Sequence, residues 1–147
     1  MYNILILNGP NLNLLGEREP EIYGTKNLDD IASELDKYAG ENDAKLIHGQ
    51  YNSESDIITA IHDAKAKKVN FIIFNPGAFT HTSIAIRDAM LGVSIPFFEV
   101  HISNIFSRED FRKKSYLSDI ATGVISGHGT YGYNLALISA IKELKGN

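Results

Sequence analysis

The sequence predicts an α/β fold in which helices cover both faces of a parallel β-sheet. Three observations predict it. Runs typical of strands alternate with segments typical of helices, the strand runs have continuous apolar cores, and no linker or repeat divides the 147 residues. Strands that are apolar along their whole length are typical of parallel sheets, because such strands are buried on both faces.

Each element is predicted by a local pattern. Runs rich in Ile, Val, Leu and Phe predict strands at 4–7, 44–49, 69–74, 95–100 and 123–126. Apolar residues at helical spacing predict helices at 28–39, 53–64, 82–90, 109–113 and 133–144. Asn27 and Ser53 are expected to cap the first two. Five strands in a chain of this length indicate a flavodoxin-like three-layer sandwich of order 2-1-3-4-5, and we interpret 1–147 as a single domain.

The composition narrows the class of function. The 14 Lys and Arg against 18 Asp and Glu give a net charge of −4, which argues against general nucleic-acid binding. Without cysteine the chain forms neither a disulfide nor a thiolate zinc site. No apolar run approaches the ~20 residues of a membrane helix. The first apolar run ends at once in a turn, so we find no signal peptide and expect a cytoplasmic protein without a membrane partner.

Motifs of several cofactor-dependent classes are missing. There is no Walker A loop, no G-x-G-x-x-G after the first strand and no G-x-S-x-G nucleophile elbow. No lysine stands at a predicted strand end to form a Schiff base, and no acidic cluster there suits a hard metal ion. We therefore expect a site that uses neither a cofactor nor a metal.

Polar residues gather where the predicted strands end, and open α/β sheets bind ligands there. They are Asn8, Asn11, Gln50, Asn52, Asn75, His81, Glu99, His101 and Ser103. Turn preferences alone explain the amides that follow the first strand. They explain Glu99 and His101 less well.

Glu99 and His101 are two residues apart on one predicted strand, so their side chains share a face. A carboxylate beside an imidazole fixes its tautomer and favours its protonated form, as a general acid near neutral pH requires. An isolated Glu-x-His is more often a structural pair, but the strand-end position favours a catalytic role.

Other charged residues near these strand ends allow two interpretations. Arg108 and Arg112 are one helical turn apart and repel each other unless an anion lies near them. The two acidic residues after Arg108 could instead neutralise them on a solvated face, which is the commoner arrangement. His81 and Asp88 are nearly in phase on the third predicted helix, although each alone fits a surface position. For His128, in a Gly-His-Gly loop, a plain loop residue is the default interpretation.

The longest irregular segment, 8–26, is of a length that in compact domains is usually functional or disordered. It carries Arg18 and Tyr23. Tyrosine ionises near pH ~10, too high for an effective base at neutral pH, and a neighbouring guanidinium lowers that value. The pair suggests a base on an active-site lid around 15–25, although a tyrosine that folds back onto the core is the commoner case.

Taken in order, these segments resemble one known family, the type II 3-dehydroquinate dehydratases. The resemblance covers almost the whole chain, and the combined pattern is specific. It rests on 8–16, 18–20, 23–24, 50–54, 75–81, 84–88, 99–104 and 132–133, and on Phe106, Arg108, Phe111 and Arg112. The stretch 127–131 fits least well, because we associate a more apolar residue with position 128.

The resemblance implies a flavodoxin-like fold, a trimer-based homododecamer and cofactor-free dehydration of 3-dehydroquinate to 3-dehydroshikimate. The reaction would be an anti elimination through an enolate, in the shikimate pathway. Tyr23 would take the proton beside the ketone, with Arg18 favouring its phenolate form. Asn11 would position a water that stabilises the enolate, and His101, oriented by Glu99, would protonate the departing hydroxyl. The implied substrate-binding residues are Asn75, His81, Ile102, Ser103 and Arg112, with Arg108 on the lid side and Asp88 across a subunit contact.

The alternative is a non-catalytic flavodoxin-like module that binds a small anion or a nucleotide. It would use the same strand ends, with Arg108 and Arg112 as an anion clamp, and would not need Tyr23. The dehydration serves both aromatic biosynthesis and quinate breakdown, and the sequence does not distinguish these roles.

Overall fold

The computed structural model describes residues 1–17 and 20–146, except the side chains of Ile22 and Tyr23. The sheet consists of β1 (Tyr2–Asn8), β2 (Ala44–Gln50), β3 (Phe71–Asn75), β4 (Phe97–His101) and β5 (Gly123–Ser126). All neighbouring strands are parallel, in the order β2-β1-β3-β4-β5. The predicted α/β class and strand order are therefore confirmed.

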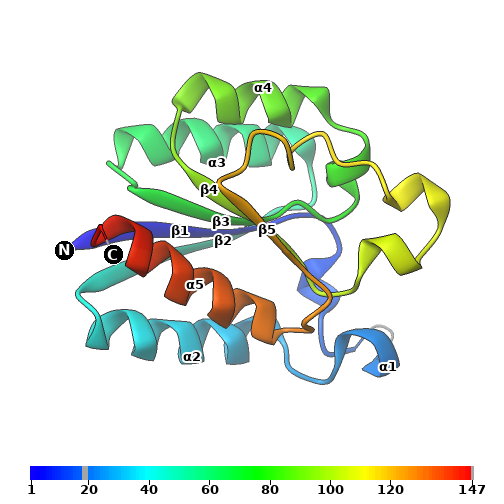
Figure 1. Cartoon of the computed structure of the whole chain (residues 1–147), viewed down its shortest axis with the longest axis horizontal. Coiled ribbons are helices and arrows are strands. Elements are labelled where there is room, and N and C mark those ends of the chain that lie inside the picture. Colours follow the sequence, from blue (N-terminus) through cyan, green and yellow to red (C-terminus); the bar gives the residue numbers. More distant parts are fainter. Residues whose placement is uncertain (18–19, 147) are drawn as a thin grey trace.

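Longer helices cover both faces of this sheet. They are α2 (Leu28–Glu41), α3 (Glu54–Ala66), α4 (Ile84–Val93) and α5 (Tyr131–Leu144). Figure 1 shows α3 and α4 on one face and α2 and α5 on the other. In the part of the chain that the structure describes, no helix is both long enough and apolar enough to cross a membrane.

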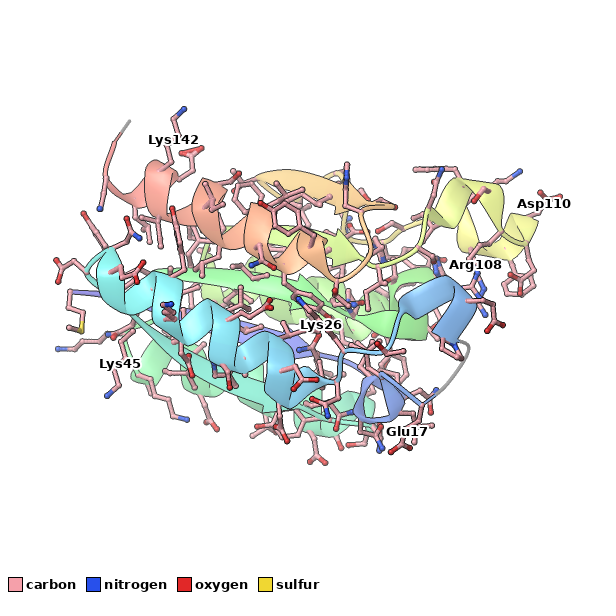
Figure 2. The ribbon with its side chains drawn as sticks, turned by 90° about the horizontal axis from the view of Figure 1, so that it is seen from below. Glu17, Lys26, Lys45, Arg108, Asp110 and Lys142 are labelled. Atoms are coloured by element: carbon pink, nitrogen blue, oxygen red, sulfur yellow. The ribbon has the colours of Figure 1, made fainter. Side chains whose placement is uncertain are left out.

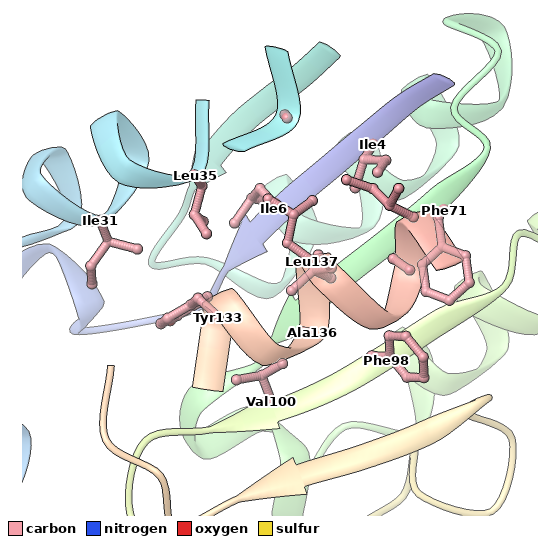
Figure 3. Close-up of a cluster of buried hydrophobic side chains, with 14 of the residues drawn as sticks. Ile4, Ile6, Ile31, Leu35, Phe71, Phe98, Val100, Tyr133, Ala136 and Leu137 are labelled. Carbon is pink, nitrogen blue, oxygen red and sulfur yellow. The ribbon is translucent and has the colours of Figure 1, made fainter. Parts of the chain in front are cut away.

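The two-residue period of β1 explains why both faces are covered. Ile4 and Ile6 pack with residues of α2 and α5, whereas Leu5 and Leu7 pack with residues of α3 and α4. Figure 3 shows the first of these layers, which also contains Tyr133 of α5. Because both faces of the strand are buried, its sequence is apolar at successive positions.

Side-chain caps fix the starts of α2 and α3, as predicted. The Asn27 side chain accepts a hydrogen bond from the N–H of Asp30 at 2.9 Å, and Asp30 returns one from the N–H of Asn27 at 3.1 Å. The Ser53 hydroxyl accepts from the N–H of Asp56 at 3.1 Å. These bonds satisfy N–H groups that have no partner within the helix.

The predicted start of the third helix is wrong, and the error changes the site. The helix expected at 82–90 begins two residues later, because the Ser83 hydroxyl caps its first turn. His81 instead ends a separate 3-10 helix, η2 (Gly77–His81). His81 and Asp88 therefore do not lie in phase on one helix.

The segments between the main elements are more regular than predicted. The stretch 8–26 contains η1 (Leu12–Leu14) and α1 (Pro20–Tyr23). The helix expected at 109–113 is a short 3-10 helix, η4 (Asp110–Arg112), which follows η3 (Ile105–Ser107). Figure 1 shows α1 and the segment after β4 at the end of the molecule opposite the two termini. The carboxyl ends of the strands point to that end.

Candidate active site

A cavity of about 130 Å³ lies where β1, β3 and β4 end. Its apolar wall includes Leu12, Leu15 and Ile105. Figure 2 shows Arg108 at the end of the molecule that also carries Glu17, away from Lys45 and Lys142. The cavity brings together eight of the site residues predicted from the sequence: Asn11, Asn75, His81, His101, Ile102, Ser103, Arg108 and Arg112.

Glu99 and His101 form a buried pair on β4, with exposed fractions of 0% and 5%. The Nε2–H of His101 donates to Glu99 Oε2, and Glu99 Oε1 accepts from the hydroxyls of Ser115 (3.0 Å) and Ser118 (2.8 Å). Burial alone would raise the pKa of Glu99, but the bond and charge of His101 and the two hydroxyls hold it below its ordinary value. Glu99 is therefore a carboxylate at neutral pH, and Nδ1 of His101 is left for a ligand.

His81 lies beside His101, with ring centroids 6.4 Å apart and an angle of 20° between the rings. Its Nδ1–H donates to the carbonyl of Lys114 at 2.7 Å. Burial lowers the pKa of His81, and the charges of His101 and Arg112 lower it further, although the bond to Lys114 opposes this. The ring is therefore mainly neutral at neutral pH, and its Nε2 can accept a hydrogen bond from a ligand.

The amide of Asn75 is held at the end of β3 by a chain of buried hydrogen bonds. Its Nδ2 donates to the hydroxyl of Tyr133 at 2.9 Å, and that hydroxyl donates to Asn8 Oδ1. The Oδ1 of Asn75 accepts from the N–H of Gly77 at 3.2 Å. Burial raises the pKa of Tyr133, so its phenol stays protonated and acts as a donor, not as a base.

Arg108 and Arg112 line the cavity, as expected for an anion site, and also contact an acidic residue, as expected for a solvated face. The Oε1 of Glu109 lies 3.1 Å from Arg112 Nε and 3.6 Å from Arg108 Nε. Asp110 instead pairs with Lys113 at 2.8 Å, so the expectation that both acidic residues neutralise the arginines is half right. Guanidinium groups on a cavity wall suit an anionic ligand.

Asn11 is placed on the cavity wall by the turn after β1. Its N–H donates to Asn52 Oδ1 at 3.0 Å, and Gln50 Nε2 donates to the same oxygen at 3.0 Å and to the carbonyl of Gly9 at 3.1 Å. A Cβ at Gly9 would lie 2.3 Å from the carbonyl oxygen of Pro76, so only glycine allows this close approach. The turns after β1 and β3 are thereby packed together.

Other residues considered from the sequence are either away from the cavity or outside the described part of the structure. Asp88 is exposed on α4 and does not line the cavity. Arg18 and the side chain of Tyr23 lie outside the described part of the structure. His128 is exposed and also does not line the cavity. Among the described side chains, no group of three or more His, Asp and Glu residues is arranged to hold a metal ion.

Three residues that hold the site were not found from the sequence: Ser115, Ser118 and Tyr133. The serines follow Glu99 by 16 and 19 residues, so no strand or helix period links them to it. Tyr133 starts the last predicted helix and lies in a segment that carries the family resemblance, but its local pattern predicts no role in the site. Two serines three residues apart on an irregular segment are the sole signal that could have pointed to them.

The geometry supports proton transfer to and from a small ligand. The cavity wall has an imidazole paired with a buried carboxylate behind it, a second imidazole that accepts, a fixed amide and two guanidinium groups. These groups provide a proton donor, hydrogen-bond donors for a developing oxyanion and positive charge for an anionic substrate. Such a set suits acid–base chemistry on a polar carboxylate.

Comparisons with known proteins agree with this geometry. Residues 2–141 match the family model described as Dehydroquinase class II. The chain is 60% identical to the 3-dehydroquinate dehydratase of Psychromonas ingrahamii, covering 97% of this chain and 95% of the relative. It is 59% identical to that of Legionella pneumophila strain Corby, covering 99% and 100%. The crystal structure of type II dehydroquinase from Propionibacterium acnes is similar, with a TM-score of 0.91, 44% identity and 97% of each chain covered.

Proposed function

The chain belongs to the class II dehydroquinase family and catalyses the dehydration of 3-dehydroquinate, and we propose that it does so by anti elimination through an enolate in the cavity described above. The observation that carries this proposal is the buried Glu99–His101 pair, whose histidine lines the cavity. It supplies a positioned acid, which the loss of a hydroxyl group requires.

His101 is the proposed acid. Hydroxide is a poor leaving group, so the departing oxygen must receive a proton as its bond to carbon breaks. Because Nε2 of His101 is bonded to Glu99, the proton comes from Nδ1 and the oxygen leaves as water. Glu99 keeps the ring in this orientation and stays ionised.

Tyr23 is the proposed base, with Arg18 stabilising its phenolate. It would take the proton from the carbon beside the ketone, and the electron pair would move to the ketone oxygen as an enolate. In support, no tyrosine whose side chain the structure describes lines the cavity. Gly16 and Gly24, both at positive φ, flank this segment, which we propose to be a lid around 15–25 of a single catalytic domain spanning 1–147.

The remaining wall would hold the substrate and stabilise the enolate. We propose that Asn11 positions a water beside the enolate oxygen, where a donor aimed at developing charge lowers the barrier. Direct contacts would come from Asn75, His81, Ile102, Ser103 and Arg112, and Arg108 would act from the lid side. The two guanidinium groups fit the negative charge of the substrate.

We propose that the chain assembles into a homododecamer built from trimers, in which Asp88 reaches a neighbouring site. Asp88 lies between two exposed apolar residues of α4, Ile84 (57% exposed) and Leu91 (51% exposed). Residues at these spacings share one helix face, and an apolar face around a carboxylate suits a subunit contact. The proposed compartment is the cytoplasm, and the N-terminal apolar run is accounted for as the buried strand β1.

Ultraviolet absorbance tests the activity directly, because the dehydrated product is a conjugated enone. Adding 3-dehydroquinate to the protein should give a steadily increasing absorbance, whereas the same protein after heat denaturation should give none. If protein that circular dichroism shows to be folded gives no increase, the alternative of a non-catalytic anion-binding module would be favoured.

A further inference from the structure

Glu99 is held on both of its oxygens, and the second oxygen has no part in the mechanism so far. Oε2 binds His101, whereas Oε1 accepts from Ser115 at 3.0 Å and from Ser118 at 2.8 Å. The carboxylate itself is fully buried. Neither serine lines the cavity. Both therefore act on the site only through Glu99.

The Ser115 hydroxyl has its direction fixed by its other partners. It accepts from the N–H groups of Leu117 (3.0 Å) and Ser118 (3.1 Å). A hydroxyl has one hydrogen and two acceptor sites, so its hydrogen is left for Glu99. Ser115 can therefore donate a hydrogen bond to the ionised carboxylate but has no site left to accept one from a protonated carboxyl group.

The segment that carries the serines is anchored to the rest of the fold. Arg87 of α4 donates to the carbonyl of Tyr116 at 2.8 Å and pairs with Asp119 through both carboxylate oxygens. Leu117 is buried in the core layer under α3 and α4. The carbonyl of Lys114 accepts from His81. The same anchored segment thus donates hydrogen bonds to Glu99, the partner of His101, and accepts one from His81.

We propose that Ser115 and Ser118 are positioning residues that hold the Glu99 carboxylate against His101 Nε2 and thereby leave Nδ1 as the proton donor. This inference rests on the proposed function of the cavity. Without the two hydroxyls, Glu99 would lose donors that oppose its burial, and its hold on the His101 tautomer would weaken.

The proposal predicts a change in pH dependence with a defined sign. The titratable groups that face Glu99 are His101 on β4 and His81 from η2, while its neighbours on β3 and β5 are the uncharged Phe74 and Val124. The serine hydroxyls lower the pKa of Glu99, so removing one raises it. Glu99 then becomes protonated at a higher pH as the pH falls, and the acid limb of the kcat profile moves to higher pH.

The test compares Ser115→Ala, Ser118→Ala and the double variant with wild type and with Ser53→Ala. Ser53 caps α3 and, unlike Ser115 and Ser118, donates no bond to Glu99, so its variant loses a hydroxyl and some stability without a direct effect on Glu99. We expect each serine variant to lose about ten- to hundredfold in kcat, as for a lost hydrogen bond to a charged group, with KM nearly unchanged. The acid limb should move to higher pH, furthest in the double variant, and Ser118→Thr should restore it in part.

A second readout needs no substrate. Nitrogen NMR of labelled histidine at alkaline pH should show His101 as the Nε2–H tautomer in wild type and as a mixture of tautomers in Ser118→Ala. This readout distinguishes the positioning role from the proposed function. A wild type without dehydratase activity would contradict the proposed function, but the tautomer of His101 could still be measured. Unchanged tautomer and an unshifted acid limb, with losses no larger than in Ser53→Ala, would overturn the positioning role.

Discussion

Each cavity histidine has one ring nitrogen committed to the protein and one left for a ligand. His101 commits Nε2 to Glu99, whereas His81 commits Nδ1 to the carbonyl of Lys114. The parallel rings therefore offer different nitrogens, Nδ1 from His101 and Nε2 from His81. One ring is arranged to give a proton and the other, mainly neutral, to accept a hydrogen bond. This asymmetry suits a reaction in which a single hydroxyl group leaves.

Replacing His101 with Ala should remove the proton donor. We expect kcat to fall by several powers of ten, more than the ~10²–10⁴ of acid catalysis alone if substrate orientation is also lost. Binding of 3-dehydroquinate, measured by calorimetry, should persist because the arginines and Asn75 remain. His128→Ala is the matched control, since His128 is exposed and away from the cavity. A near-normal kcat in His101→Ala would require another acid.

Tyr23→Phe and Arg18→Ala should both be severe, for different reasons. The first keeps the ring but deletes the ionisable oxygen, so turnover should nearly vanish at every pH. The second keeps the phenol but removes the charge that favours phenolate, so its residual rate should rise with pH. The measurement is a pH–rate profile of both variants and wild type, with circular dichroism as the folding control. Close to normal turnover in folded Tyr23→Phe would move the base to a water or to His81.

How much of the site could be predicted depends on how its residues are spaced. The contact between Glu99 and His101 follows from the two-residue period of a strand. Ser115 and Ser118 could not be predicted, because only the three-dimensional path of an irregular segment brings them to Glu99. Residues that act at a distance along the chain leave no local pattern to detect.

At the scale of elements, burial decides which predictions were accurate. The central strand runs were found because β1, β3 and β4 are buried on both faces along most of their length and are therefore largely apolar. The start of α4 was missed by two residues because Thr82 and Ser83 are both plausible caps, and only the structure shows that Ser83 is used. Helix ends depend on single hydrogen bonds, so a sequence defines them less sharply.

The buried phenol of Tyr133 links α5 to β1 and β3, so Tyr133→Phe should affect both stability and the site. It leaves Asn8 and Asn75 without their partner, which should lower the free energy of unfolding by about 1–3 kcal/mol. The freed Asn75 amide should also raise KM, because its orientation is no longer fixed. Urea unfolding and steady-state kinetics measure the two effects. Tyr131→Phe, on the same helix but exposed, is the control. Lost stability with an unchanged KM would make Tyr133 purely structural.

For the whole molecule, the topology decides where chemistry can occur. The sheet places the carboxyl ends of all five strands at one end, and the core layers on either side hold those ends fixed. The polar side chains that follow β1, β3 and β4 thus converge without being close in sequence. The fold and the position of the site at the strand ends were therefore predictable. Subunit contacts depend on surface residues, which do not repeat at the spacing of buried residues in a helix or strand.

Assembly is the prediction that belongs to the whole molecule. Light scattering of the wild type should show a large homo-oligomer, because Ile84 and Leu91 form an exposed apolar pair on one face of α4 around Asp88. Leu91→Glu would bury an unpaired carboxylate in that contact, so the assembly should dissociate and the activity should fall with it. Lys142→Glu makes a larger charge change on α5, which covers the opposite face of the sheet from α4 (Figure 1), and should leave both unchanged. A wild-type monomer with full activity would contradict the proposed contact, since Asp88 could then reach no neighbouring site.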